Sequence, residues 1–257
     1  MRPVMKSVGA DIAVENLVHR FSGGRIGLDR VNLNIRPGEL VVIAGRNGSG
    51  KTTLLKHLNG LLTPTMGTVR IDGISVARDP RRARRRVGLV FQDTETQIVG
   101  ETVSADIAFG PENLGLPPEE VRRRVAEALR SMQLEHLSEA HPHLLSGGEK
   151  RRLAIAGVLA MMPGAICLDE PFSNLDLPGV RQVLAALIEL HSAGHTLVVV
   201  THEIEKMLPH ARRMALMDRG RVVADGAVEE VILLAEHHGV RQPEAFRLRG
   251  EIRSWLD

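Results

Sequence analysis

Short apolar runs alternate along the chain with segments of helical periodicity. Four runs rich in β-branched residues are typical of strands buried on both faces of a sheet: residues 40–44, 87–91, 165–168 and 196–200. Helix signals occupy much of the chain between and beside them: residues 52–58, 118–132, 150–162 and 178–191. This alternation predicts an α/β fold, with a mainly parallel sheet covered by helices on both faces.

Other segments alternate residue by residue between apolar and polar side chains, as half-exposed strands do. Three of them predict strands, the first two as an antiparallel flap ahead of the core: residues 11–21, 31–36 and 67–73. Residues 214–217 and 221–224 predict a strand pair, followed by helices that run to Trp255. Residues 93–117 are polar and interrupted by glycine and proline.

One stretch, GRNGSGKT at residues 45–52, fits the phosphate-binding pattern G-x-x-x-x-G-K-[ST] at every required position. Its glycines let the backbone approach a polyphosphate, while N–H groups and a helix N-terminus face the anion. Lys51 would reach the β- and γ-phosphates, and the Thr52 hydroxyl would help to hold Mg²⁺. The alternative is a glycine-rich turn that binds nothing, which the flanking strand and helix disfavour.

Polar residues follow three of the other apolar runs. Because ligands of such sheets collect beyond the carboxyl ends of the strands, we expect Gln92, Asp169 and His202 to lie near the loop. Asp169 offers Mg²⁺ a hard carboxylate beside Thr52. Glu170, which points another way, is the predicted general base or water-orienting carboxylate. His202 could donate to the γ-phosphate and sense its loss, with a structural role as an equal alternative.

Composition narrows the class of protein. A chain of 257 residues can bury a full core, and one cysteine excludes an intramolecular disulfide framework, which fits a reducing compartment. The sequence has no apolar stretch suited to a signal peptide or a membrane span. An aromatic content of 2% without tyrosine argues against a stacking platform for nucleic acid. Six arginines between residues 78 and 86 predict a solvated face or, alternatively, contact with anionic lipid or a partner.

Several motifs, in their order and approximate spacing, resemble the nucleotide-binding domain of ATP-binding cassette (ABC) proteins. They span nearly the whole chain: GRNGSGKT, Gln92, LSGGE at 145–149, CLDEP at 167–171, SNLD at 173–176 and Thr201-His202. The resemblance implies a P-loop NTPase fold of ABC type, with a mainly parallel sheet core, an N-terminal antiparallel β subdomain and a helical signature subdomain. It also implies ATP hydrolysis with Mg²⁺ as cofactor.

By the same resemblance, ATP lies between two head-to-tail protomers, and the site residues form distinct groups. The phosphate-binding residues are Gly45, Asn47, Gly48, Ser49, Gly50, Lys51, Thr52 and Thr53. The catalytic residues are Glu170, His202 and Gln92, and the Mg²⁺ ligands are Thr52, Gln92 and Asp169. The signature residues, which would face the ATP of the opposite protomer, are Ser146, Gly147, Gly148 and Glu149. The loop across the dimer interface is Ser173, Asn174, Leu175 and Asp176.

The chain departs from the family pattern at the base. Family members commonly stack adenine on a tyrosine upstream of the phosphate loop, and this chain has no tyrosine. Phe21 is the nearest substitute, with an ordinary core position as the alternative. Glu149 stands where glutamine is more common, which we regard as a minor change.

A narrower resemblance covers the middle third of the chain. Residues 91–117 and 145–161 look like the ATPase subunit of energy-coupling-factor importers, which take up cobalt, nickel, biotin or other vitamins. This implies a homodimer, or a pair with a homologous ATPase, on the cytoplasmic side of the cell membrane. It further implies a transmembrane scaffold subunit, contacted through the segment after Gln92, and a substrate-binding membrane subunit.

We expect a single ABC ATPase domain over residues 1–257. Its parts would be a nucleotide-binding core with β flap (about 11–92 and 163–226), a helical signature subdomain (about 93–162) and C-terminal helices (about 227–257). One alternative is another transporter type, such as an exporter. A nucleic-acid-associated ABC ATPase is less favoured, because the chain has one cassette and no heptad run between Lys51 and Leu145. We therefore expect no nucleic acid partner.

Overall fold

A six-stranded sheet forms the centre of the computed structural model, which describes residues 8–256. Its strands, in spatial order, are β10 (Arg221–Ala227), β9 (Arg213–Asp218), β3 (Leu40–Gly45), β8 (Thr196–Val200), β7 (Ala165–Asp169) and β6 (Val87–Val90). All neighbours are parallel except β10, which pairs antiparallel with β9. Every residue of β3, β6, β7 and β8 is buried, as expected for apolar strands covered on both faces. Cys167 lies in the middle of β7.

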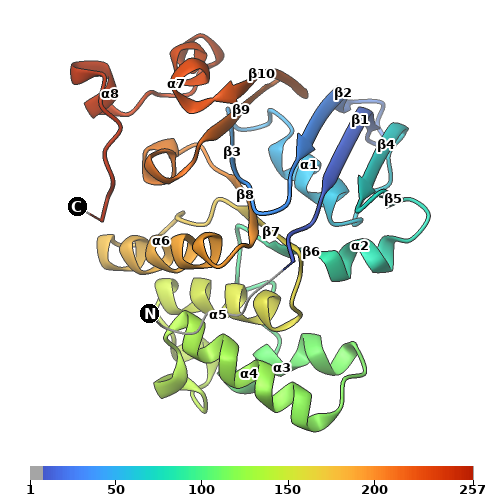
Figure 1. The fold of residues 1–257 in the computed structure, drawn as a ribbon, viewed down its shortest axis with the longest axis vertical. Coiled ribbons are helices and arrows are strands. Elements are labelled where there is room, and N and C mark those ends of the chain that lie inside the picture. Colours follow the sequence, from blue (N-terminus) through green and yellow to red (C-terminus); the bar gives the residue numbers. More distant parts are fainter. Residues whose placement is uncertain (1–7, 257) are drawn as a thin grey trace.

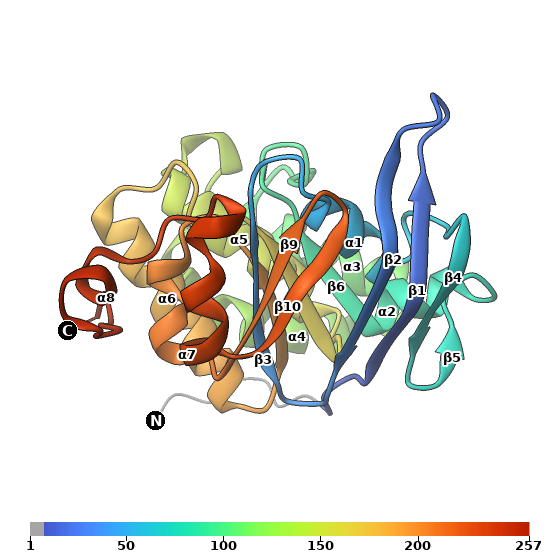
Figure 2. The ribbon, with the colours of Figure 1, turned by 90° about the horizontal axis from the view of Figure 1, so that it is seen from above.

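A second, four-stranded antiparallel sheet packs beside the first. Its strands, in spatial order, are β2 (Ile26–Ile35), β1 (Ile12–Arg20), β4 (Met66–Ile71) and β5 (Ile74–Ser75). Inward-facing residues of this sheet, such as Ile12 and Leu28, join α1 (Lys51–Leu58) and one face of the central sheet in one apolar cluster. Figure 2 shows α1 between the two sheets.

Helices cover the other face of the central sheet. They are α5 (Gly147–Ala160), α6 (Leu177–Ser192) and the short α7 (Val228–Val231), which share a second apolar cluster. Beyond α5 lie α3 (Val103–Asn113) and α4 (Pro118–Met132), at the end of the molecule away from the antiparallel sheet (Figure 1). The predicted fold class is therefore confirmed. None of the described helices is long and apolar enough to span a membrane.

The arginine run forms α2 (Pro80–Arg86), which Asp79 caps by accepting from the Arg82 N–H. Arg86 is partly buried and pairs with Asp72 at 2.7 Å. Arg84 donates to the Gly60 carbonyl oxygen. The remaining arginines of the run are exposed, in agreement with a solvated face: Arg78, Arg81, Arg82 and Arg85.

The segment 93–117 contains α3, which begins at a Thr102 cap and buries Val103 and Ile107 against α5. Gly110 and Pro111 lie in the second half of this helix. One prediction about secondary structure was wrong. At the C-terminus, α8 (Glu244–Arg249) ends at Gly250 in the left-handed conformation, so helix does not continue to Trp255.

Candidate functional site

The phosphate-loop motif forms a tight connection from β3 to α1. Gly48 and Gly50 have φ angles of 80° and 105°, which other residues adopt only with strain. Gly45 must also lack a side chain, because a Cβ there would come within 2.3 Å of the Met217 carbonyl oxygen. The sequence therefore places glycine where the loop conformation requires it, and N–H groups at the start of α1 remain available to an anion.

Lys51 lies inside this loop. Its Nζ donates to the carbonyl oxygens of Gly45, at 2.7 Å, and Arg46, at 3.1 Å. Burial lowers the pKa of the Lys51 ammonium, while the nearby charges of Glu170 and Asp169 oppose that shift. The loop thus holds a desolvated cation next to two carboxylates, an arrangement suited to a polyphosphate with its metal ion.

A cavity of about 380 Å³ opens above this loop at the carboxyl ends of the strands. Most predicted nucleotide-site residues line it: Phe21, Asn47, Gly48, Gly50, Lys51, Thr52, Thr53, Gln92, Asp169, Glu170 and His202. Gly45 and Ser49 do not line the cavity; both are buried within the loop. The Ser49 hydroxyl is buried without a hydrogen-bond partner.

Asp169, at the end of β7, faces the start of α1. The Thr52 hydroxyl is hydrogen-bonded to its carboxylate. Burial raises the pKa of Asp169, the Thr52 bond opposes this, and the neighbouring charge of Glu170 adds to it. A hydroxyl and a hard carboxylate at the rim of a phosphate loop, with the Gln92 amide lining the same cavity, fit the oxygen donors that Mg²⁺ prefers.

Glu170 is held in an unusual backbone conformation. Its φ is 47°, in the left-handed region that a glutamate occupies only at a cost. Its carboxylate accepts from the buried Thr201 hydroxyl at 3.1 Å and from the His202 N–H at 3.1 Å. His202 Nδ1 lies 2.9 Å from Glu170 Oε1, although the His202 side chain is 52% exposed. A strained backbone at Glu170 therefore carries a carboxylate whose orientation is fixed by its hydrogen bonds, a combination that is common at functional sites.

Phe21 borders the nucleotide cavity and also contacts its neighbours in the antiparallel sheet. Its ring lines the nucleotide cavity, and it also packs edge-on against His19 with ring centroids 4.7 Å apart. The Arg25 guanidinium lies 4.8 Å from the centroid of the Phe21 ring. Gly27 passes so close that a Cβ there would touch the ring at 2.6 Å. A base could stack only on the part of this ring that faces the cavity.

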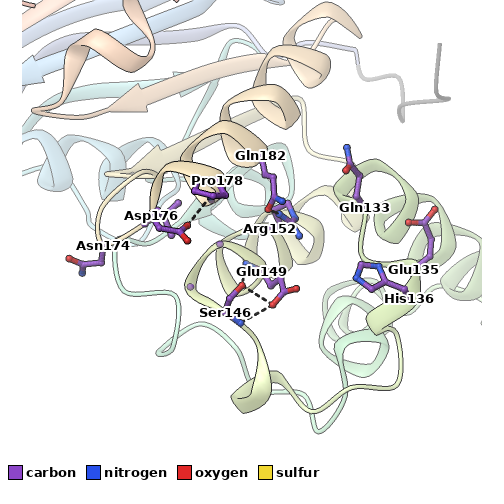
Figure 3. Close-up of a pocket in the computed structure, with 14 residues that line it drawn as sticks. Gln133, Glu135, His136, Ser146, Glu149, Arg152, Asn174, Asp176, Pro178 and Gln182 are labelled. Atoms are coloured by element: carbon purple, nitrogen blue, oxygen red, sulfur yellow. Dashed lines mark hydrogen bonds between the residues drawn. The ribbon is translucent and has the colours of Figure 1, made fainter. Parts of the chain in front are cut away.

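The signature residues line a different cavity, of about 740 Å³ (Figure 3). Ser146 caps α5 and forms a capping box with Glu149, whose carboxylate accepts from the Ser146 N–H at 2.8 Å and from its hydroxyl at 2.7 Å. These hydrogen bonds lower the pKa of Glu149. The motif thus provides its own anion at the N-terminus of α5.

The predicted dimer-interface loop borders the same cavity. Asn174 has a φ of 62°, and Asp176 caps α6 by accepting from the Gly179 N–H at 2.9 Å. Asn174, Leu175 and Asp176 line the cavity, whereas Ser173 lies beside it and donates its N–H to the Glu170 carbonyl oxygen. Of the described residues, none lines both cavities.

Sequence reasoning missed several polar residues around these cavities. Arg151, 4% exposed, donates to the carbonyl oxygens of Phe91 and Gln92 and so fixes the end of β6. The signal was the basic run directly after LSGGE. Further residues line the signature cavity, from the segment after α4, the turn η1 (Glu135–Leu137), α5 and α6: Gln133, Glu135, His136, Arg152 and Gln182. Their participation depends on contacts between distant segments, which no local pattern reveals.

Together, the loop, the strand-end carboxylates and the capped signature helix define an ATPase of the ATP-binding cassette class. The family model for ABC transporters matches residues 28–173, and the chain belongs to this family. It is 39% identical over 253 residues to an energy-coupling factor transporter ATP-binding protein, EcfA1, of Clostridium novyi, which covers 95% of this chain and 90% of the relative. It is 46% identical over 224 residues to the cobalt import ATP-binding protein CbiO of Rhodobacter capsulatus, covering 86% and 80% of the two chains.

Solved structures agree with this assignment. CbiO1 of Clostridium perfringens, described as part of the ABC transporter complex CbiONQ, superimposes with a TM-score of 0.80 and 34% identity over 96% of this chain and all of that one. The cassette MJ0796 matches with a TM-score of 0.75 and 31% identity over 84% of this chain and 98% of that one. MJ0796 was solved as a dimer in a post-hydrolysis state with ADP and Pi.

Proposed function

We propose that this chain is the ATP-hydrolysing subunit of an energy-coupling-factor importer and that two copies enclose ATP head to tail. The observation that carries the proposal is the separation of two complementary sites on one chain. One cavity has Lys51, Asp169 and Glu170, whereas the other has Ser146 at a helix N-terminus. Because the two cavities share no lining residue, each copy needs the signature of a second copy to cover its nucleotide.

Within each nucleotide site, Lys51 and the loop N–H groups would bind the β- and γ-phosphates. Thr52, Asp169 and Gln92 would hold Mg²⁺, which when bound supplies positive charge to the phosphoryl oxygens. Glu170 would orient or deprotonate the attacking water, since its carboxylate is an acceptor with a defined direction. His202 would act from beside it, through the contact of its ring with Glu170.

The membrane partners of the proposal rest on resemblance. Several relatives, among them EcfA1 and CbiO, are ATP-binding proteins of energy-coupling factor and cobalt transporters. Both half-sites of this chain retain their expected residues. The chain would therefore act as a peripheral protein on the cytoplasmic face of the membrane. Its partners would be a transmembrane scaffold subunit and a substrate-binding subunit, with a transition-metal ion or a vitamin as cargo.

Glu170→Gln tests the catalytic assignment. The substitution removes the base but keeps the side-chain length, so ATP turnover should fall about 10²- to 10⁴-fold while ATP binding is retained. Gel filtration with ATP should then give a dimer, because the closed state is no longer lost by hydrolysis. Undiminished turnover together with a monomer would count against the proposal.

Copurification from membranes tests the transporter type. A small multi-helix scaffold protein together with a substrate-binding membrane subunit is the expected result. A pair of large permeases would instead identify another ABC transporter type, such as an exporter or a conventional importer.

A further inference from the structure

A buried lysine, Lys206, lies behind the catalytic centre without lining the nucleotide cavity. It is 4% exposed and belongs to η3 (Ile204–Lys206), the turn that follows His202. Its Nζ pairs with Glu203 Oε2 at 2.8 Å. The same Nζ lies 5.6 Å from the centroid of the Phe172 ring and 5.2 Å from that of the Trp255 ring. A buried ammonium within about 6 Å of an aromatic ring centroid is attracted to the face of the ring, and more strongly so when water is excluded.

The two rings come from segments that lie far apart in the sequence. Phe172, 1% exposed, follows Glu170 by two residues. Trp255, the one tryptophan of the chain, lies on the tail that turns back from α8 toward the body of the molecule (Figure 1). The Ser254 hydroxyl is 3.2 Å from His210 Nε2, which ties the tail to η4 (Leu208–His210). The chain has five phenylalanines, one tryptophan and no tyrosine, and two of these six rings lie next to Lys206.

Lys206 thereby connects the two segments that carry the catalytic pair. On one side it contacts the ring of Phe172, in the segment of Glu170. On the other it pairs with Glu203, the neighbour of His202. The Glu203 N–H donates to the Thr201 hydroxyl at 3.0 Å, and that hydroxyl donates to Glu170 at 3.1 Å. A single cation therefore restrains both partners of the contact between Glu170 and His202.

We propose that Lys206 is a positioning residue for ATP hydrolysis and that the C-terminal tail acts through it, with Trp255 closing the site of the lysine ammonium. When the tail is in place, Lys206 is enclosed and holds the turn after His202 against the segment of Glu170. Without Trp255 the ammonium would gain access to water, and the turn would lose one side of its restraint. The inference rests on the proposed function, because it assumes that Glu170 acts on the attacking water.

Steady-state ATP turnover by the full chain tests this proposal with paired substitutions. Lys206→Met and Trp255→Ala should each lower kcat about tenfold, since small displacements of a reacting group are costly. The KM for ATP should stay within about twofold, because neither residue lines the nucleotide cavity. Lys206→Arg and Trp255→Phe retain a cation and a ring, and should restore most of kcat.

Arg253→Ala is the matched control. Arg253 lies on the same tail and is exposed, and its ion pair is with Glu251 of the tail itself, so this substitution should leave kcat unchanged. A thermal unfolding midpoint for each variant verifies that it is folded. If Lys206→Met does not fold, Trp255→Ala, at a partly exposed position, decides the question.

The proposal is overturned if folded Lys206→Met and Trp255→Ala keep kcat within about twofold, or if the loss falls on KM alone. It is also overturned if Lys206→Arg and Trp255→Phe lose as much as their partners. These outcomes are distinct from failure of the proposed function, which would appear as full turnover by Glu170→Gln. An inactive Glu170→Gln beside fully active Lys206→Met would refute the positioning role alone.

Discussion

The nucleotide cavity and the signature cavity are built on different principles. Residues of the first lie at the carboxyl ends of buried strands, and their charges interact with each other, as Lys51 does with Asp169 and Glu170. The second is formed by the capped N-terminus of α5 and a loop, and its anion, Glu149, comes from the same motif. The difference is that the nucleotide cavity gathers charges of both signs from several strand ends, whereas the signature cavity presents a helix N-terminus where Glu149 already supplies a negative charge.

Lys51→Ala should have the largest effect, because it removes the buried ammonium held inside the phosphate loop. We expect ATP affinity to fall at least about 100-fold, since charge-assisted contacts to phosphate are among the strongest in such sites. Isothermal titration with ATP and Mg²⁺ measures this directly. Binding within a few-fold of the unmodified chain would show that the two cavities do not differ as described.

Ser146→Arg should separate the two cavities. The large side chain would fill the N-terminus of α5, yet Ser146 lines only the signature cavity, so each chain should still bind ATP. Dimer formation with ATP should disappear, and turnover should fall about 100-fold because hydrolysis needs the closed state. Gel filtration and ATPase assays provide the measurements; normal dimers with full turnover would refute the shared site.

Acid should destabilise the part of the molecule around α1 through His57, which is buried in the last turn of that helix. Burial, together with the neighbouring His19, lowers its pKa from 6.5 to about 4. The unfolded chain therefore binds more protons than the folded chain between about pH 4 and 6.5, so stability is full above this window and is lost as the pH falls through it.

The loss amounts to about 3 kcal/mol at most, from the size of the shift. Urea unfolding at pH 7.5 and pH 5 measures it. His57→Gln removes the titrating group and should flatten the pH dependence between these values; an unchanged dependence in that variant would assign the effect to other groups.

Glu149→Gln should give the smallest effect, and in the opposite direction. Glutamine can still complete the capping box, but it removes the negative charge that hydrogen-bonds to Ser146. The γ-phosphate of the partner's ATP would then meet less repulsion, and dimer formation in the Glu170→Gln background should need about two- to fivefold less ATP. Glu189→Gln, an equal change of charge on an exposed residue that lines neither cavity, should have no effect.

Local chemistry explains which features could be predicted from the sequence. The phosphate loop depends on glycines and a lysine within eight residues, and the buried strands depend on continuous apolar runs, so both were recognisable. The α3 helix was missed because its apolar stripe is short and is completed by packing on α5. Glycine and proline late in that helix outweighed the Thr102 cap as a signal.

Contacts between distant segments could not be predicted. The bond between the Glu170 carboxylate and the Thr201 hydroxyl joins the ends of two neighbouring strands, and only the strand order brings them together. Arg151 likewise reaches the end of β6 from α5. The meeting of Phe172, Lys206 and Trp255 joins three segments with no shared motif, and no pattern along the chain indicates it.

The buried Cys167 provides a chemical probe for opening of the central sheet. Burial in the middle of β7 raises the pKa of its thiol, so the reactive thiolate is suppressed while the central sheet is intact. The chain has one cysteine, and it lies two residues before Asp169. The rate at which a thiol reagent labels the native protein therefore measures how often the sheet opens at this position. Nucleotide that binds the folded chain should slow the labelling of Cys167 in proportion to its occupancy. The labelling rate then reports on ATP binding without any substitution.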